Sequence, residues 1–172
     1  MATNTRDKLM DATVRCLLEH GHAGCTVKQI ARLAGVNHGL VHHYFGSKEQ
    51  LMLEVLQREA GRIEAELDAV SDSADFRVFA RQRIVNNPPM MRLMVESMSM
   101  AEQMPALAEA VREIIRRRAD HFQRTLGLPD RGTALVVMSC VLGLALFSRA
   151  EPEVDVAASL ETVLRGLGAN RS

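Results

Sequence analysis

The apolar residues of this chain recur every three to four positions, and this spacing limits its possible folds more than any other feature. The first such run, after a polar start, is Leu9, Ala12, Thr13, Cys16 and Leu17. This is the pattern of an amphipathic helix. No strong alternation of apolar and polar residues appears, and no proline precedes residue 88. With no tryptophan, one tyrosine and five phenylalanines among 172 residues, a sandwich or barrel core built on aromatics is not expected. We predict an all-α protein.

Caps and breaks divide the chain into about nine helices. The first helix is expected to stop at Gly21. Residues 26–29 then form a Thr-x-x-Gln capping box for a two-turn helix, which Gly35 is placed to end in a left-handed turn. Asn37, a favoured N-cap, starts a third short helix that ends near residue 46. A second capping box, 47–50, opens a long helix to about Val70. Further helices are predicted to about residue 85, from 89, from 105 to about 126, at 133–149 and at roughly 154–167.

Composition places the chain among intracellular globular proteins. The 21 Lys and Arg balance 21 Asp and Glu, but residues 1–50 hold six basic against four acidic residues and five of the six histidines. Three widely spaced cysteines do not form a disulfide framework and suit a reducing cytoplasm. No secretory signal is recognisable. The apolar run 133–147 is shorter than a bilayer span. We expect a soluble, cytoplasmic protein with no membrane partner.

The third helix has two different faces. At 100° per residue, Val41 and Phe45 lie together and are expected to face inward with Val36. Two short helices joined by a three-residue turn also have the dimensions of a helix-turn-helix motif. The inward face therefore indicates that this helix packs on the one before it.

The opposite face is suited to DNA. It places Gly39 and His43 outward, flanked by Leu40 and His42. A glycine permits close backbone approach, an apolar side chain can contact a thymine methyl group, and imidazole nitrogens can reach base edges or phosphates. The helix starts at residues 26 and 37, with Lys48 beyond, are placed to hold phosphates on either side. This face is predicted to enter the major groove.

Residues 6–56 resemble the DNA-binding domain of the TetR family. The matching positions are Gly21, Thr26, Ile30-Ala31, Ala34-Gly35-Val36, Gly39, Val41, Tyr44-Phe45 and Ser47-Lys48-Glu49-Gln50-Leu51. The resemblance implies an all-α homodimer, with an N-terminal helix-turn-helix domain at 1–47 and a ligand-binding and dimerisation bundle at 48–172. It also implies binding to a palindromic operator on double-stranded DNA, commonly as a repressor. The candidate DNA contacts are Thr26, Lys28, Asn37, His38, Gly39, Leu40, His42, His43, Tyr44 and Lys48.

One position departs from the family pattern. The tyrosine with which the family usually contacts phosphate falls at residue 42, where this chain has histidine. Imidazole can also donate to phosphate, over a shorter reach and with a charge that depends on pH. The alternative interpretation of the histidines is a solvated helix face.

A zinc site made from Cys16, His20, His22 and Cys25 is an alternative interpretation of these residues. The spacing matches no standard finger, and Cys16 lies on the apolar face of its helix, where a buried cysteine is normal. We therefore predict no metal and no cofactor.

Six of the ten methionines lie within residues 90–104. Core packing is the default interpretation, but methionine also suits a pocket that adapts to its contents. The resemblance implies a pocket among the middle helices, and we expect it to take a small apolar effector. The candidate ligand contacts are Phe76, Phe79, Met90, Met94 and Met98.

The helix at 133–149 is apolar on nearly all sides, so one side needs a partner outside its own bundle. Ser139 and Gly143, one turn apart, would allow a second helix to approach closely. We predict that this helix and the last one form a dimer interface. Its candidate residues are Val136, Ser139, Cys140, Gly143, Leu144 and Phe147.

No enzyme is predicted. The chain shows no glycine-rich phosphate loop, no Ser/His/Asp arrangement and no pair of catalytic carboxylates. The function that the sequence favours is a DNA-binding transcriptional regulator, as a repressor released by a small apolar ligand. The alternative is a helical adaptor that binds a ligand or a protein without using DNA.

Overall fold

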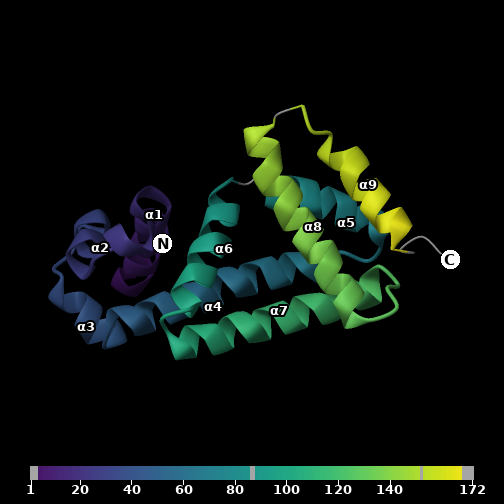
Figure 1. Cartoon of the computed structure of the whole chain (residues 1–172). Helices are drawn as coiled ribbons and strands as arrows, with labels where there is room; N and C mark the ends of the chain where they lie inside the picture. Colours follow the sequence, from purple (N-terminus) through teal and green to yellow (C-terminus); the bar gives the residue numbers. More distant parts are fainter. Residues whose placement is uncertain (1–3, 86–87, 152, 168–172) are drawn as a thin grey trace. The chain divides into compact units, whose positions relative to one another are not determined.

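The structure, a computed structural model, describes residues 4–85, 88–151 and 153–167 (Figure 1). The side chains of residues 73, 83–85, 88–91 and 149 lie outside this description. The described residues form helices and no strand, which confirms the predicted all-α class. The elements are α1 (Thr5–Gly24), α2 (Val27–Ala34), α3 (Gly39–Phe45), α4 (Lys48–Leu67), α5 (Ser73–Phe79), the π-helix η1 (Ala80–Val85), α6 (Pro88–Ala101), α7 (Pro105–Thr125), α8 (Arg131–Ala150) and α9 (Val156–Gly166).

The predicted caps are present, with one difference. The Thr26 hydroxyl accepts the Gln29 N–H at 3.2 Å, and the Ser47 hydroxyl accepts the Gln50 N–H at 3.0 Å. The return half of each capping box is replaced, because the Gln29 amide bonds to His20 and the Gln50 amide to Glu54. At each of these helix starts, the hydroxyl group accepts its backbone hydrogen bond, but the glutamine side chain does not return one.

Two glycines shape the N-terminal helices. Gly35 adopts φ 67° and ψ 35°, the left-handed conformation predicted for the end of α2, and its N–H bonds to the carbonyls of Ala31 and Arg32. Gly21 has φ 66° and ψ 178°, which interrupts the helical path of α1 inside its bounds. Both conformations are costly for residues with a Cβ atom.

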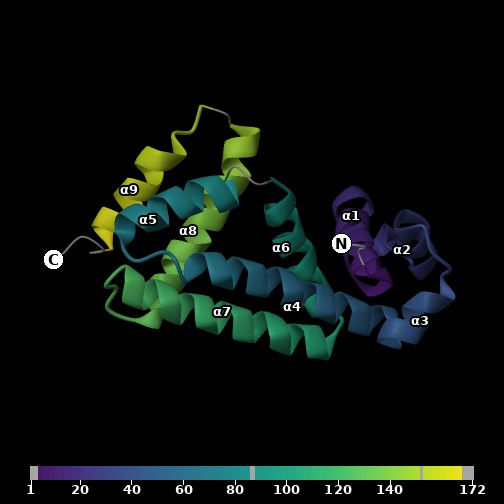
Figure 2. The ribbon, with the colours of Figure 1, turned by 180° about the vertical axis from the view of Figure 1, so that it is seen from behind.

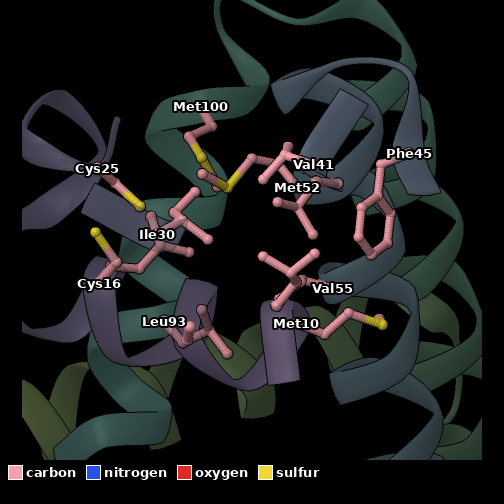
Figure 3. Close-up of a cluster of buried hydrophobic side chains, with 14 of the residues drawn as sticks. Met10, Cys16, Cys25, Ile30, Val41, Phe45, Met52, Val55, Leu93 and Met100 are labelled. Atoms are coloured by element: carbon pink, nitrogen blue, oxygen red, sulfur yellow. The ribbon is translucent and has the colours of Figure 1, made fainter. Parts of the chain in front are cut away.

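The first of two compact units comprises Met1–Gly61 and Arg92–Arg112. Its core gathers apolar side chains from α1, α2, α3, α4, α6 and the start of α7, several of which Figure 3 shows pointing toward one another. Fully buried leucine, isoleucine and valine side chains each stabilise such a core by about 1.5–3 kcal/mol. The core includes Leu9, Cys16, Leu17, Cys25, Ile30, Val41, Phe45, Leu51, Met52, Val55, Leu93, Met100 and Leu107.

The second unit comprises Arg62–Met91 and Glu113–Ser172. In both views of the chain, α5 and α9 lie close to α8, and the last turn of α4 lies beside α7 (Figures 1 and 2). The rings of Phe76 and Phe122 meet edge to face at 4.8 Å in its core. The remaining core residues include Leu67, Val70, Phe79, Leu126, Leu128, Val137, Val141, Leu160 and Leu164. The predicted domain boundary at residues 47 and 48 falls at the start of α4 and stays a prediction.

Among the described residues, one helix, α8, is long enough and apolar enough to cross a membrane, judged by length and composition only. Its segment Arg131–Ser148 has a mean hydropathy of 1.7. The apolar run 133–147 is itself shorter than a bilayer span, but the helix extends beyond it on both sides. A single such helix is a weak indication of a membrane span, and Ala134, Val137 and Val141 are buried in the second core.

Candidate nucleic-acid interface

The third helix is held by its inward face, as predicted. Val41 is fully buried, Phe45 is 5% exposed, and both belong to the first core. Val36, in the turn before α3, packs against the same core. Asn37 caps the start of the helix, because its side-chain oxygen accepts the Gly39 N–H at 2.8 Å. Position and direction of α3 are thus set by apolar contacts on one side and a cap at one end.

The opposite face of α3 is open. Gly39, His42 and His43 are exposed, and Tyr44 retains 38% of its accessible surface. The rings of His43 and Tyr44 meet edge to face at a centroid distance of 5.0 Å. Leu40 is half-buried because it packs partly against the first core. Only part of the Leu40 side chain is therefore accessible for the predicted apolar contact with DNA.

His42 is oriented by the backbone that follows α3. Its Nδ1 lies 3.0 Å from the Gly46 carbonyl oxygen, and a carbonyl can only accept a hydrogen bond. Nδ1 must therefore carry the proton, which leaves Nε2 as an acceptor when the ring is neutral. Phosphate oxygens also only accept, so Nε2 can donate to DNA only after the ring becomes an imidazolium.

Two further helix starts flank the exposed face. Thr26 and Lys28, at the start of α2, are exposed, and His38 is exposed beside Asn37. Lys48 is half-buried at the first position of α4. Helix N-termini attract anions through their free N–H groups and the helix dipole. Thr26, Lys28 and Lys48 thus lie at the starts of α2 and α4, and their contacts with phosphate stay a prediction.

Long-range ion pairs that the sequence did not indicate fix α1 to α4. Arg6 pairs with Glu54, and its guanidinium also lies over the Phe45 ring at 5.3 Å. Arg58 pairs with Asp11 at 2.8 Å. Partners nearly fifty residues apart leave no local pattern, so only the fold reveals them.

The residues of the rejected zinc site are not gathered around a common centre. Cys16 and Cys25 are buried in the first core, and desolvation, together with the hydrogen bond between the two thiols, raises the pKa of the Cys25 thiol. Desolvation and nearby Lys48 lower the pKa of His22, whose Nδ1 is buried with no hydrogen-bond partner in the described structure. Among the described residues, no group of three or more His, Cys, Asp or Glu side chains is arranged to hold a metal.

The predicted ligand contacts fall in both units. Phe76 and Phe79 are buried in the second core, whereas Met94 is half-buried and Met98 is 41% exposed in the first unit. The side chain of Met90 lies outside the described residues. In the second unit, an open hollow of about 290 Å³ is lined by other residues, among them Glu64, Arg118 and His121. The predicted pocket therefore stays a prediction.

The predicted dimer residues lie mainly on an exposed stripe of α8. Val136 and Ser139 are exposed, Cys140 and Gly143 are half-buried, and Phe147 keeps 69% of its accessible surface. Two apolar residues that were not predicted, Leu135 and Leu146, are also exposed here. Leu144 differs, because it packs partly against the second core.

The described residues thus define an all-α protein whose N-terminal part is a helix-turn-helix: two short helices joined by a tight turn, the second with an exposed polar face. Residues 9–55 match the sequence model of the bacterial regulatory proteins of the tetR family. Over these residues the chain is similar to the tetR family.

Curated relatives resemble the N-terminal part. The chain is 36% identical over 61 residues to the HTH-type transcriptional repressor AcnR of Corynebacterium glutamicum, a match that covers 36% of this chain and 32% of that protein. It is 50% identical over 52 residues to the HTH-type transcriptional regulator BetI of Agrobacterium fabrum, which covers 30% of this chain and 25% of that protein. The matches thus span about a third or less of each relative.

Similarity of fold extends over nearly the whole chain. A crystal structure of a transcriptional regulator from Rhodococcus sp. Rha1 superposes with a TM-score of 0.83 at 21% sequence identity. The superposition covers 95% of this chain and 96% of that one. The helices beyond residue 60 are therefore included in the similarity of fold.

Proposed function

We propose that this protein is a sequence-specific, DNA-binding transcriptional regulator. The observation that carries the proposal is the exposed polar face of α3, held outward by the buried Val41 and Phe45. Such a helix fits the major groove, while helix N-termini on either side face the phosphates. The repressor AcnR and the regulator BetI are similar to this chain in the same N-terminal region. The working compartment is then the bacterial cytoplasm.

The regulator acts as a homodimer on a palindromic operator. The exposed stripe of α8 supports this part of the proposal, since Val136, Leu146 and Phe147 are apolar and open to solvent. Half-buried Gly143 would let a second helix approach closely. A two-fold axis pairs the same stripe of both chains and presents two copies of α3 to successive major grooves, roughly 34 Å apart.

The protein represses transcription, and binding of a small apolar ligand relieves the repression. AcnR, with which the chain shares its N-terminal region, is named a repressor. The methionines of α6 supply adaptable apolar surface, of which Met94 is half-buried and Met98 exposed. A ligand can release DNA only if it binds one arrangement of the protein more tightly than the other.

The test is selection of bound duplexes from random-sequence DNA with the purified protein, followed by affinity measurements over a range of salt concentrations. We expect a motif with two-fold symmetry and an affinity that falls steeply as salt rises. Replacing both His42 and His43 by alanine should remove the preference for the motif. Val78→Ala, a change at an exposed residue of the second unit, is the control. Failure to enrich any motif would favour the adaptor that does not use DNA.

A further inference from the structure

The break in α1 at Gly21 exposes a backbone donor. Because Gly21 leaves the helical path, the residues after it cannot bond back to the preceding turn in the usual way. The N–H of His22 instead donates to Glu96 Oε2 at 2.7 Å. A carboxylate from α6 therefore caps the broken end of α1.

A side chain at residue 21 would crowd this contact. A Cβ atom placed on Gly21 would lie 3.2 Å from Glu96 Oε1 and 3.6 Å from Oε2. The backbone at φ 66° would also be strained for any other residue. Gly21 thus permits both the break in the helix and the close approach of the Glu96 carboxylate.

The partner of Glu96 is the peptide N–H and not the imidazole. Desolvation and the charge of Lys48 lower the pKa of His22, which favours the neutral ring. The bond is therefore a charge-assisted hydrogen bond from a neutral peptide group, which is shorter and stronger than one between two neutral groups.

Glu96 lies on the face of α6 that packs on the first core. Leu93 and Met100 are buried there, at spacings of three and four residues from Glu96. Ser97, next to it, is buried and bonds back to the Leu93 carbonyl. Two apolar side chains therefore hold α6 on the first core, and one directed polar bond ties it to the end of α1.

We propose that Glu96 is a positioning residue that fixes the helix-turn-helix on α6, so that a movement of α6 turns α1 and the helices packed on it. The apolar anchors allow sliding, whereas a hydrogen bond to one backbone N–H defines a single register. This inference rests on the proposed DNA-binding function. In this inference, Glu96 helps to set the distance between the two α3 helices of the dimer and does not itself contact DNA.

The contact itself is tested by NMR on the full-length protein. The amide proton of His22 should resonate downfield and exchange slowly in the wild type. Glu96→Ala should move it upfield and speed exchange, while Glu96→Gln, which keeps an acceptor oxygen, should restore most of both signatures. A wild-type His22 amide with neither signature would overturn the proposal, even if Glu96→Ala failed to fold.

The positioning role is tested with selected operators in which the half-sites are moved together or apart by one base pair. We expect the wild type and Glu96→Gln to prefer the selected spacing by about tenfold, because a shifted half-site no longer faces its α3. Glu96→Ala should lose most of this preference, whereas Lys48→Ala should weaken binding to every spacing alike. An unchanged spacing preference in a folded Glu96→Ala protein would overturn this inference but not the proposed DNA-binding function. A wild type that selects no duplex would overturn the proposed function as well.

Discussion

Single residues on and beside α3 differ in what they can offer to DNA. His43 is exposed on the outward face, where a side chain can reach base edges, whereas half-buried Lys48 lies at a helix start and offers only charge. The two positions therefore separate sequence preference from general affinity.

His43→Ala should weaken binding to the selected operator by about 1–3 kcal/mol and should affect random DNA less. Lys48→Ala should weaken binding to both and reduce the slope of log affinity against log salt by about one unit. Fluorescence anisotropy with both duplexes over a salt series measures these effects. Equal losses on both duplexes for His43→Ala would show that His43 does not contact bases.

His42 predicts a dependence on pH. Since Nδ1 is committed to the Gly46 carbonyl, Nε2 can donate to phosphate only in the protonated ring, so binding takes up a proton. Operator affinity should therefore fall as pH rises from about 6 to 8, by at most about 1.4 kcal/mol per pH unit for each proton taken up.

The matched control is His42→Tyr, which donates a neutral hydrogen bond at every pH in this range. It should flatten the profile without abolishing binding, although His38 and His43 add any dependence of their own. A wild-type profile as flat as that of His42→Tyr, at constant ionic strength, would remove the electrostatic role of His42.

At the scale of elements, the turn between α2 and α3 fixes the motif. Gly35 ends α2 at φ 67°, and the space where a Cβ would lie is empty within 4 Å. The cost of a side chain there is therefore conformational and not steric. Gly35→Ala should lower the free energy of unfolding by about 1–2 kcal/mol.

Asparagine tolerates the left-handed conformation better than alanine, so Gly35→Asn should cost clearly less. Urea unfolding curves of the three proteins give the comparison. Equal stability of Gly35→Ala and the wild type would mean that the turn does not require the left-handed conformation in solution.

The helix ends could be predicted from short sequence patterns, whereas contacts between residues far apart in the sequence could not. The caps at Thr26, Asn37 and Ser47 and the turn at Gly35 follow from short patterns, because capping bonds span two to four residues. The bond from His22 to Glu96 joins residues 74 apart in sequence, and no spacing rule connects them.

The candidate site shows the same division. The inward Val41 and Phe45 could be assigned from helical periodicity, and so could the outward His43. The hydrogen bond that selects the tautomer of His42 could not, because it depends on the carbonyl direction at Gly46. Leu40 and Leu144 were both predicted as contacts with partners, but each packs partly on its own core.

For the whole molecule, the exposed stripe of α8 predicts the oligomeric state. A charge at Phe147 or Gly143 would be buried in the dimer without a partner, at a cost of several kcal/mol. Phe147→Glu and Gly143→Glu should therefore yield monomers or aggregates, and both should lose operator affinity because two copies of α3 are needed.

Gln103→Glu, a new charge at an exposed position outside the stripe, is the control and should remain dimeric. Light scattering with size separation measures the mass of each variant. Intact, soluble dimers of both stripe variants would place the dimer interface elsewhere.

The most direct measurement of the central claim is photo-crosslinking from α3 to a selected operator. A benzophenone-bearing amino acid replaces His43 in one protein and Val78, an exposed residue of the second unit, in another. We predict crosslinks from position 43 to bases in each half-site and none from position 78. Operator binding by both proteins with no crosslink from position 43, or with crosslinks from position 78, would contradict the assignment of α3 as the helix that contacts DNA.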